Sequence, residues 1–421
     1  MISSLQDING RHFDVCIVGT GPAGIMVALE FERSHPTRRI LLLEYGLPEE
    51  TAINGLDDSI NVAEPLYHHL PYECTNKGFG GTSATWGGRC VMYDEVDFLA
   101  RKPFEQHCTW PENIYNEIHP FLDRTADYFE CAPGAFELHG LASFGIAYRP
   151  IVEGFREGPV LDSPVEKWSR PTRFARAFGD RVRGSKSIVL CTGMEVRQVG
   201  EMRDGGRINS LLVRDRANGS ETSVRAKFFV LAAGAQETTR LLLKSPGAFA
   251  ARGGLPSTLG KFYQGHISGK IASVQFTGDS SRTDYGFARL PTGEYIRRRF
   301  QFPIETLLKN GILNTAIWLD NPPYFDPEHR SGAMSFMYLA MLMPWLGRRL
   351  APPAVAHSIT KGKTYRVGAH LANIAKGLPA SILIPASIFF RRYCLSRKLP
   401  GVLLPSKSNR FAVHFHAEQI P

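Results

Sequence analysis

The order of apolar and polar positions at the start of the chain predicts a strand, a helix and a second strand. Residues 13–18 are apolar apart from Asp14, and a short apolar run with β-branched side chains is typical of a buried parallel strand. Residues 25–31 continue as a helix, and the apolar run at residues 40–43 follows at the distance expected for a βαβ unit. We therefore expect a parallel sheet that begins with these two strands.

A similar pattern of strand, turn and helix returns later in the chain. The apolar residues 228–231 lead into the small residues 232–235, and residues 237–243 have the spacing of a helix. A strand that ends in small residues lets a ligand lie against the backbone at the carboxyl edge of a parallel sheet. We expect further short strands at residues 187–191, 195–199, 208–214 and 221–225, the last two forming a hairpin.

From residue 260 onward, the pattern changes to strands that are separated by turns, which is typical of an antiparallel sheet. These strands are expected at residues 270–276, 294–301 and 315–319. The final segment alternates between two faces. One face holds Phe411, Val413, Phe415 and Ala417, and the other holds Ala412, His414, His416 and Glu418. The polar face can line a substrate cavity or meet solvent, and the sequence supports both equally.

Two apolar runs of about thirteen residues interrupt this second region, at residues 334–346 and 378–390. A helix needs about twenty apolar residues to cross a bilayer, so neither run is long enough. Buried helices are one interpretation. Helices that lie on a membrane surface are the other, because Arg348-Arg349 and Arg391-Arg392 flank the two runs.

The composition is that of a globular protein large enough for two domains, with 421 residues of which 43% are hydrophobic. The net charge of +9 could favour anionic membranes or phosphorylated substrates. No pattern of a nucleic-acid-binding module is present, so we expect no nucleic-acid partner. The seven cysteines form no Cys-x-x-Cys pair, and no signal-peptide pattern precedes the first strand. We therefore expect a cytoplasmic protein, with peripheral membrane contact as an alternative.

The turn between the first strand and the first helix carries the features of a dinucleotide site. It reads Gly19-Thr20-Gly21-Pro22-Ala23-Gly24. Gly19 permits a tight turn, Gly21 lets a pyrophosphate approach the backbone, and Gly24 lets the helix lie close to the strand. Glu44 ends the second strand, where an acid can accept hydrogen bonds from both ribose hydroxyls. The same acid argues against a 2′-phosphate, and hence against NADP.

A second glycine-rich segment follows at residues 78–90. Its composition does not fit a regular core element, and it suits a backbone that wraps around a flat or charged ligand. An elaborate surface loop is the alternative. The candidate ligand-binding residues of this segment and of the later small-residue turn are Gly80, Gly81, Thr82, Ser83, Thr85, Trp86, Ala233 and Gly234.

The same motifs resemble those of the glucose–methanol–choline (GMC) flavoprotein oxidoreductases. The turn at residues 19–24 with Glu44, the loop at residues 80–86 and the segment at residues 232–238 carry the match. Other motifs are similar to the branch with bacterial sugar and alcohol dehydrogenases and pyranose oxidase. They are Asp97-Phe98, Trp110-Pro111 and Glu418-Gln419-x-Pro421.

The predicted fold class is α/β, with an FAD/NAD(P)-binding, Rossmann-like domain and a second domain built on an antiparallel sheet. We assign residues 10–130 and 185–260 to the FAD-binding domain. Residues 131–184 and 261–421 are assigned to a substrate domain.

The resemblance implies FAD as the cofactor and hydride transfer to flavin N5 from a CH–OH group of a sugar or another alcohol. It implies ADP over the turn at residues 19–24 and Glu44, with adenine near the backbone of Val196. The loop at Gly80-Gly81 would run beside the pyrophosphate and the isoalloxazine. Some relatives attach flavin through a His at the place of Thr85, so we expect non-covalent FAD. The electron acceptor is not implied.

The resemblance also exposes one difference. Family members usually continue past the point where this sequence stops, and that further part holds the His–His or His–Asn pair that takes the alcohol proton. We therefore expect a substrate domain that is incomplete at its C-terminus, and the catalytic residues are unknown. His414, His416 and Glu418 are the local candidates, and their His-x-His-x-Glu spacing alone does not support a metal site. The alternatives are a truncated FAD-binding chain without catalytic activity and another two-domain flavoprotein, such as an amine oxidase.

Overall fold

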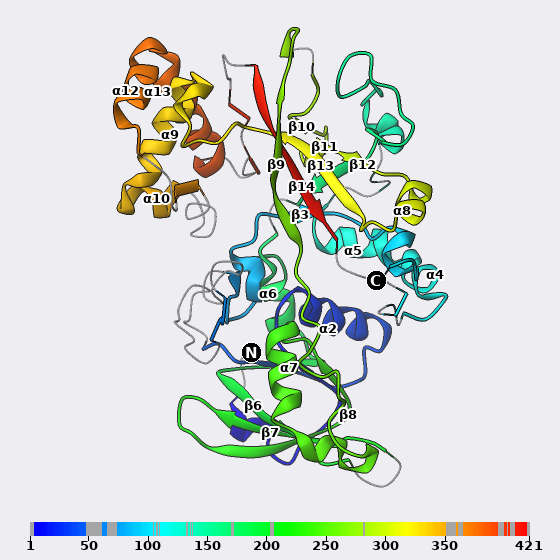
Figure 1. The fold of residues 1–421 in the computed structure, drawn as a ribbon. Helices are drawn as coiled ribbons and strands as arrows, with labels where there is room; N and C mark the ends of the chain where they lie inside the picture. Colours follow the sequence, from blue (N-terminus) through cyan, green and yellow to red (C-terminus); the bar gives the residue numbers. More distant parts are fainter. Residues whose placement is uncertain are drawn as a thin grey trace. The chain divides into compact units, whose positions relative to one another are not determined.

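The chain divides into two compact units in the computed structural model (Figure 1). The first unit comprises Met1–Trp86 and Thr172–Tyr263, and the second comprises Gly87–Pro171 and Gln264–Pro421. The structure describes residues 4–47, 61–64, 74–103, 105–106, 108, 110–131, 134, 136, 138–169, 172–202, 206–280, 283–350, 359–360, 365–394, 400–401, 403–404 and 409–418.

A six-stranded sheet forms the centre of the first unit, in the order β5-β2-β1-β8-β7-β6. The strands are β1 (His12–Val18), β2 (Ile40–Glu44), β5 (Ile188–Thr192), β6 (Met194–Val199), β7 (Ser210–Asp215) and β8 (Glu221–Leu231). The four strands β5, β2, β1 and β8 are parallel, and β7 and β6 continue the sheet in antiparallel fashion. Val18 lies opposite Leu43 on one side and Leu231 on the other. The carboxyl ends of these three strands therefore meet at one edge, where ligands bind to such sheets.

The first sheet has the strands and helices that the sequence pattern predicts. The helix α2 (Pro22–Ser34) connects β1 to β2, and all five residues of β2 are buried. The hairpin of β7 and β8 turns between Arg214 and Glu221. The other helices of this unit are α1 (Leu5–Ile8), η1 (Gly81–Ala84), α6 (Phe174–Gly184), α7 (Ala235–Leu243) and η5 (Pro246–Arg252).

The second unit contains two four-stranded sheets. One has the order β10-β11-β4-β3, with antiparallel pairs throughout. The other has the order β12-β13-β14-β9, also antiparallel. The strands are β3 (Arg89–Cys90), β4 (Val165–Trp168), β9 (Ile267–Gln275), β10 (Phe287–Arg289), β11 (Tyr295–Arg298), β12 (Phe300–Gln301), β13 (Thr315–Asp320) and β14 (Arg410–Ala417). The predicted strand at residues 294–301 is thus two short strands, one in each sheet.

Helices of the second unit come from three parts of the chain. The first two parts supply η2 (Glu95–Phe98), α4 (Ile114–Ile118), η3 (His119–Phe121), α5 (Leu122–Tyr128), η4 (His139–Phe144) and α8 (Ile304–Asn310). The third supplies η7 (Pro327–His329), α9 (Gly332–Leu342), α10 (Pro344–Leu350), α12 (Val367–Lys376), α13 (Ala380–Phe389) and the π-helical turn η8 (Phe390–Cys394). The predicted apolar run at residues 334–346 is broken at Met343, which is extended because Pro344 follows it.

The predicted fold class is confirmed, and two segments change places relative to the predicted domain boundaries. Residues 87–130 group with the second unit, because β3 pairs with β4. Residues 172–184 group with the first unit, because α6 packs on β5 and α2. Among the described residues, no single helix is long and apolar enough to cross a membrane, although α12 and α13 pass that test together as a pair bent by 95°.

Candidate functional site

Three glycine-containing segments of the first unit meet at the N-terminus of α2. Gly19 lies at φ +101°, and a Cβ at this residue would stand 2.5 Å from the carbonyl oxygen of Ala232. Gly81 lies at φ +53°, and its Cβ would stand 2.9 Å from the Cα of Gly21. The N–H of Gly80 donates to the carbonyl oxygen of Thr20 over 3.0 Å. The turn after β1, the loop before η1 and the turn after β8 therefore lie side by side.

At this meeting point, some glycines have no room for a side chain, whereas others have open space in front of them. A Cβ at Gly24 would stand 2.0 Å from the carbonyl oxygen of Gly19, so α2 can pack here only without a side chain. A Cβ at Gly21 or at Gly234 would have no protein atom within 4 Å. Gly21 precedes Pro22 at the start of α2, and no side chain among the described residues caps that helix. The open space in front of a 13-residue helix fits the pyrophosphate of a dinucleotide.

Glu44 lies beside this turn, but its carboxylate already has donors from the chain. Its Oε2 accepts the N–H of Thr20 over 3.1 Å and also the Thr20 hydroxyl. Its Oε1 accepts the N–H of Gly46 over 2.8 Å and the N–H of Gly78 over 3.0 Å. A carboxylate offers about four acceptor positions, and the chain fills all of them. Binding of ribose hydroxyls by Glu44 stays a prediction, and it would require exchange of some of these bonds.

Two residues of the second glycine-rich loop form hydrogen bonds that hold the loop against residues 172–174 of the same unit. The Ser83 hydroxyl donates to the carbonyl oxygen of Gly80 over 2.6 Å and accepts the N–H of Phe174 over 3.1 Å. Nε1 of Trp86 donates to the carbonyl oxygen of Thr172 over 3.0 Å. Ser83 and Trp86 therefore hold the loop in place, which is a structural role that the sequence did not specify.

The structure describes the other residues that the sequence predicts to bind the cofactor. Thr82 and Thr85 are exposed, as is Ala23 in the first turn of α2. A Cβ on Gly19 would stand 2.9 Å from the Cα of Ala233, so Ala233 lies against the glycine turn. Val196 packs its side chain on the core, and the register of β6 shifts directly after it. Contact of these residues with a cofactor stays a prediction.

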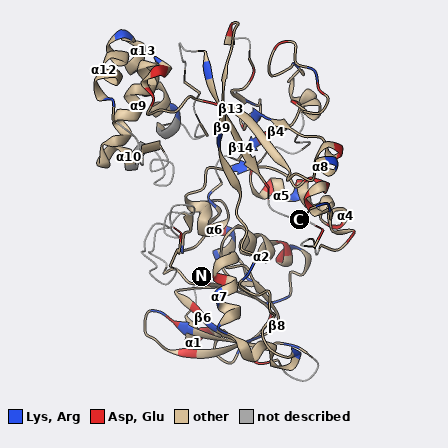
Figure 2. Ribbon diagram, viewed as in Figure 1, with Lys and Arg blue, Asp and Glu red and all other residues tan. Residues whose placement is uncertain are grey.

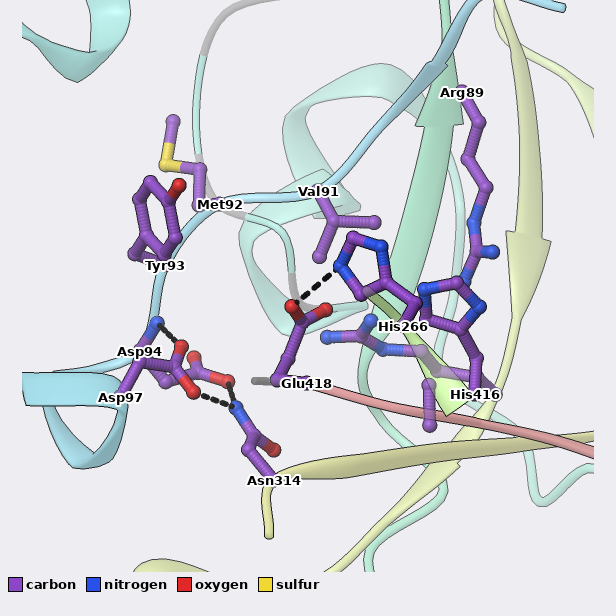
Figure 3. Close-up of a pocket in the computed structure, with 12 residues that line it drawn as sticks. Arg89, Val91, Met92, Tyr93, Asp94, Asp97, His266, Asn314, His416 and Glu418 are labelled. Atoms are coloured by element: carbon purple, nitrogen blue, oxygen red, sulfur yellow. Dashed lines mark hydrogen bonds and ion pairs between the residues drawn. The ribbon is translucent and has the colours of Figure 1, made fainter. Parts of the chain in front are cut away.

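A polar pocket of about 370 Å³ lies within the second unit (Figure 3). Nε2 of His266 lies 2.9 Å from Oε2 of Glu418, and the rings of His266 and His416 are 4.3 Å apart. On the other side, Asn314 donates from Nδ2 to Oδ2 of Asp94 over 2.8 Å and to Oδ1 of Asp97 over 3.1 Å. Arg89, Val91, Met92, Tyr93, Arg299 and Ala316 complete the lining. The pocket thus combines imidazoles, carboxylates, an amide and guanidinium groups.

The surroundings of each pocket group shift its protonation. The hydrogen bond to the carboxylate of Glu418 raises the pKa of His266. Burial lowers the pKa of His416 to about 4, with further lowering from the positive charge of Arg89. Burial alone would raise the pKa of Glu418, but the hydrogen bond with His266 and nearby positive charges bring it below its usual value. Burial raises the pKa of Asp97 to about 6. At neutral pH, the pocket therefore holds a neutral His416, and the contact with Glu418 favours the protonated form of His266.

A buried ion cluster supports the pocket from the adjacent sheet. Glu166 has no solvent exposure, and its two oxygens accept from Nη2 of Arg89 over 2.5 Å and from Nη2 of Arg297 over 2.6 Å. Burial would raise the pKa of Glu166, but Arg297, Arg89 and Arg299 outweigh it and hold the pKa below its usual value. Arg89 is therefore fixed at one end by Glu166 where it lines the pocket.

The structure separates the candidate residues of the last strand. His416 and Glu418 line the pocket, but His414 does not. The His414 ring instead stacks on Trp318 at 4.5 Å, with Nδ1 lying 3.7 Å from Oδ2 of Asp320. The sequence analysis did not single out His266. The register of β14 and β9 explains its place, because Ala417 pairs with Ile267 and so residue 266 comes next to residue 418. Gln419 and Pro421 lie outside the described residues.

His266, His416 and Glu418 each offer one ligand atom, and the three atoms lie within 4.8 Å of one another. Two imidazoles and one carboxylate are a common donor set for transition metals. However, the positive charge of Arg89 opposes protonation of both imidazoles, and the same field opposes a cation. We therefore assign no metal to this cluster.

Comparison with known proteins agrees with the motifs of the first unit. No protein-family model matches the sequence. A C-glycoside 3-oxidase from Microbacterium trichothecenolyticum is 28% identical over 199 residues, which are 46% of this chain and 36% of that protein. This partial similarity agrees with the resemblance to the GMC oxidoreductases. The match thus spans about a third of the length of this GMC relative.

Solved structures align with this chain only in part. Pyridoxine 4-oxidase from Mesorbium loti is 20% identical, with a TM-score of 0.37 over 73% of this chain and 66% of that one. A fungal aryl-alcohol oxidase is 16% identical, with a TM-score of 0.38 over 96% of this chain and 74% of that one.

Proposed function

We propose that the chain is an FAD-dependent oxidoreductase that acts on a CH–OH group of a sugar or another alcohol. The observation that carries this proposal is the open cradle at Gly21, where three glycine-containing segments meet the N-terminus of α2. The space before Gly21 and Gly234 suits a pyrophosphate and the adjoining parts of a dinucleotide. The resemblance to the GMC oxidoreductases supports FAD as that dinucleotide, since members of that family use it.

FAD would supply the hydride acceptor, and the chain would supply binding and orientation. The N–H groups at the start of α2 would hold the pyrophosphate. Thr85 has no imidazole that could form a covalent bond to the flavin, so we propose that FAD is held without a covalent link. Its hydroxyl accepts a hydrogen bond from Nδ2 of Asn76, which keeps the loop closed at this point.

We propose that the pocket of the second unit receives the substrate. Its carboxylates, amide and guanidinium groups can each bond a hydroxyl, and Tyr93, with 58% of its surface exposed, offers a ring on which the apolar face of a sugar can stack. When a CH–OH group loses its hydride, its hydroxyl must also lose a proton. The neutral imidazole of His416 can accept a hydrogen bond from that hydroxyl, and the His266–Glu418 pair can orient it.

A second candidate function is flavin binding without alcohol oxidation. A general base works best when its pKa lies near the working pH, and the pKa of His416 is about 4. His266 is hydrogen-bonded to Glu418, and this contact favours its protonated form, which cannot act as a base. The described pocket thus orients a substrate better than it removes a proton.

The experiment mixes FAD-loaded protein with a panel of sugars and primary alcohols without oxygen, and it follows the visible absorbance of the flavin. Bleaching that depends on one class of alcohol supports oxidation. Stable flavin absorbance with every substrate supports binding alone. His416→Asn should weaken or abolish any bleaching, whereas His414→Asn, on the same strand but outside the pocket, should leave most of it. Equal effects of the two variants would remove the pocket from the proposal.

A further inference from the structure

Helix α13 is apolar on every side, yet much of it faces solvent. Its residues 380–389 contain no charged side chain, and Pro385 and Ile388 are buried. Ile382 and Leu383 are exposed, with 62% of Leu383 open to solvent. A helix that is apolar all round is expected in a protein core or in contact with a membrane.

The two bent helices carry several exposed apolar side chains. Seven of them are more than a third exposed, and they follow the helical spacing along α13. We call this set the α12–α13 surface, and it consists of Val367, Leu371, Leu378, Ile382, Leu383, Phe389 and Phe390. Exposed apolar side chains in such number on neighbouring helices are typical of an interaction site.

Buried polar contacts fix the orientation of this surface. His370 of α12 is fully buried, with Nδ1 lying 2.9 Å from the Ser335 hydroxyl of α9 and Nε2 lying 3.3 Å from the carbonyl oxygen of Phe325. Ser381 of α13 is also fully buried, and its hydroxyl donates to the carbonyl oxygen of Ile374 over 3.0 Å. The sides of α12 and α13 that carry His370 and Ser381 therefore pack against the protein, and the exposed apolar side chains face solvent.

The charge of the surrounding chain is one-sided. Residues 329–417 contain thirteen Lys or Arg and no Asp or Glu. The positive charge of this segment exceeds the net charge of +9 of the whole chain. Figure 2 shows few charged residues along α12 and α13. Arg366 precedes α12, Lys376 ends it, and Arg391 follows α13. An apolar surface with a basic border complements a bilayer that contains anionic lipid.

We propose that the α12–α13 surface docks on an anionic lipid bilayer, with both helices lying in the interface rather than crossing it. Each helix has ten residues and so spans about 15 Å, half of the hydrocarbon core of a bilayer. The bend of 95° prevents the pair from forming one straight span. The aromatic rings of Phe389 and Phe390 would enter the acyl region, and Arg391 would meet the phosphate groups.

A hollow beside α13 adds to the lipid-facing character. It has a volume of about 470 Å³, and its lining is mainly apolar, with Leu383, Ile384, Ile388, Leu403 and Leu404. Arg391 is its single cationic lining residue among the described ones. The hollow can thus take an acyl chain whose anionic headgroup stays near Arg391.

The test is co-sedimentation of the full 421-residue chain with vesicles of phosphatidylcholine, with and without phosphatidylglycerol. We expect binding to the anionic vesicles that weakens as salt is added. Ile382→Glu with Leu383→Glu should reduce the bound fraction at least about tenfold, because two inserted apolar side chains are lost. Leu308→Glu is the matched control, since Leu308 is an exposed leucine of α8 in the same unit, and it should bind as the wild type does.

Circular dichroism spectra of each variant show whether the double substitution unfolds the helices. In that case, Phe390→Ser gives a second variant outside α13. Equal binding of wild type and variants, or no binding of the wild type to either vesicle, would overturn the proposal. Self-association of the wild type that the substitutions abolish would show that a second copy covers this surface, and would also overturn it. If the wild type and the double variant bind equally well to a soluble polyanion and to the anionic vesicles, charge alone explains the binding. That result would also overturn the proposal.

Discussion

Nε2 of His266 lies 2.9 Å from Oε2 of Glu418, and this contact joins two strands that are far apart in the sequence. The pKa of Glu418 is lowered, so its contribution to stability is present above its unfolded pKa and is lost as the pH falls. The pKa of His266 is raised, so its contribution is present below its unfolded pKa and is lost as the pH rises through the folded value. The pair therefore stabilises the pocket in a window between about pH 4 and pH 6.5 and less on either side.

We expect Glu418→Gln to lower the pKa of His266, because the hydrogen bond that His266 donates to the carboxylate is the largest cause of its upward shift. An NMR titration of the ring nitrogens measures this directly. Glu305→Gln is the control. It removes an exposed acid of α8 that does not line the pocket, and it should leave the titration of His266 unchanged. An unchanged His266 pKa in Glu418→Gln would show that the pair does not form.

The same titration should find that His416 stays neutral from pH 5 to pH 8, because burial and Arg89 lower its pKa to about 4. Arg89→Gln should raise the pKa of His416. Protonation of His416 near pH 6.5 in the wild-type chain would contradict the electrostatic account of the pocket.

Glu44→Ala should destabilise the chain even without cofactor. The substitution leaves the buried N–H groups of Thr20, Gly46 and Gly78 without their acceptor, which costs about 1–3 kcal/mol for a buried group. Urea unfolding of flavin-free protein measures this loss. Unchanged stability with weakened FAD binding would instead show that Glu44 serves the ribose alone.

Two glycines of the first unit should respond differently to substitution. Gly24→Ala should lower the stability of the flavin-free chain by about 1–3 kcal/mol, because its Cβ meets the carbonyl oxygen of Gly19. Gly21→Val should fold normally, because Gly21 has φ −65° and open space before it, yet it should lose FAD. Gly184→Val, at the end of α6, has equally open space and should keep FAD. Full FAD occupancy in Gly21→Val would remove the pyrophosphate from this turn.

The sequence predicted the first sheet well because each of its strands can be recognised from a short run of neighbouring residues. The apolar run before Gly19 and the run before Glu44 each form one strand, and a parallel βαβ unit follows from their spacing. The role of Glu44 in holding Gly78 could not be predicted in this way, since residue 78 comes 34 positions later. Likewise, β3 contains only two residues, so no periodicity could show that residues 87–90 join the second unit.

The pocket was predicted only in part for a related reason. The alternation of residues 411–418 placed His416 and Glu418 on one face, and the structure puts both in the pocket. The same alternation placed His414 with them, but Trp318 of β13 covers that ring. His266 became visible only through the antiparallel register of β9 with β14. An earlier start of the predicted strand, at residue 267 instead of 270, would have brought His266 next to Glu418.

The central claim is that the first unit binds FAD without a covalent bond, at the turn that contains Gly21. The most direct measurement loads the purified chain with FAD, removes unbound cofactor, precipitates the protein with acid and records the flavin spectrum of the supernatant and the pellet. The account predicts close to one FAD per chain, all of it in the supernatant, and none for Gly21→Val. A wild-type chain that retains no FAD, or flavin that stays with the precipitated polypeptide, would contradict it.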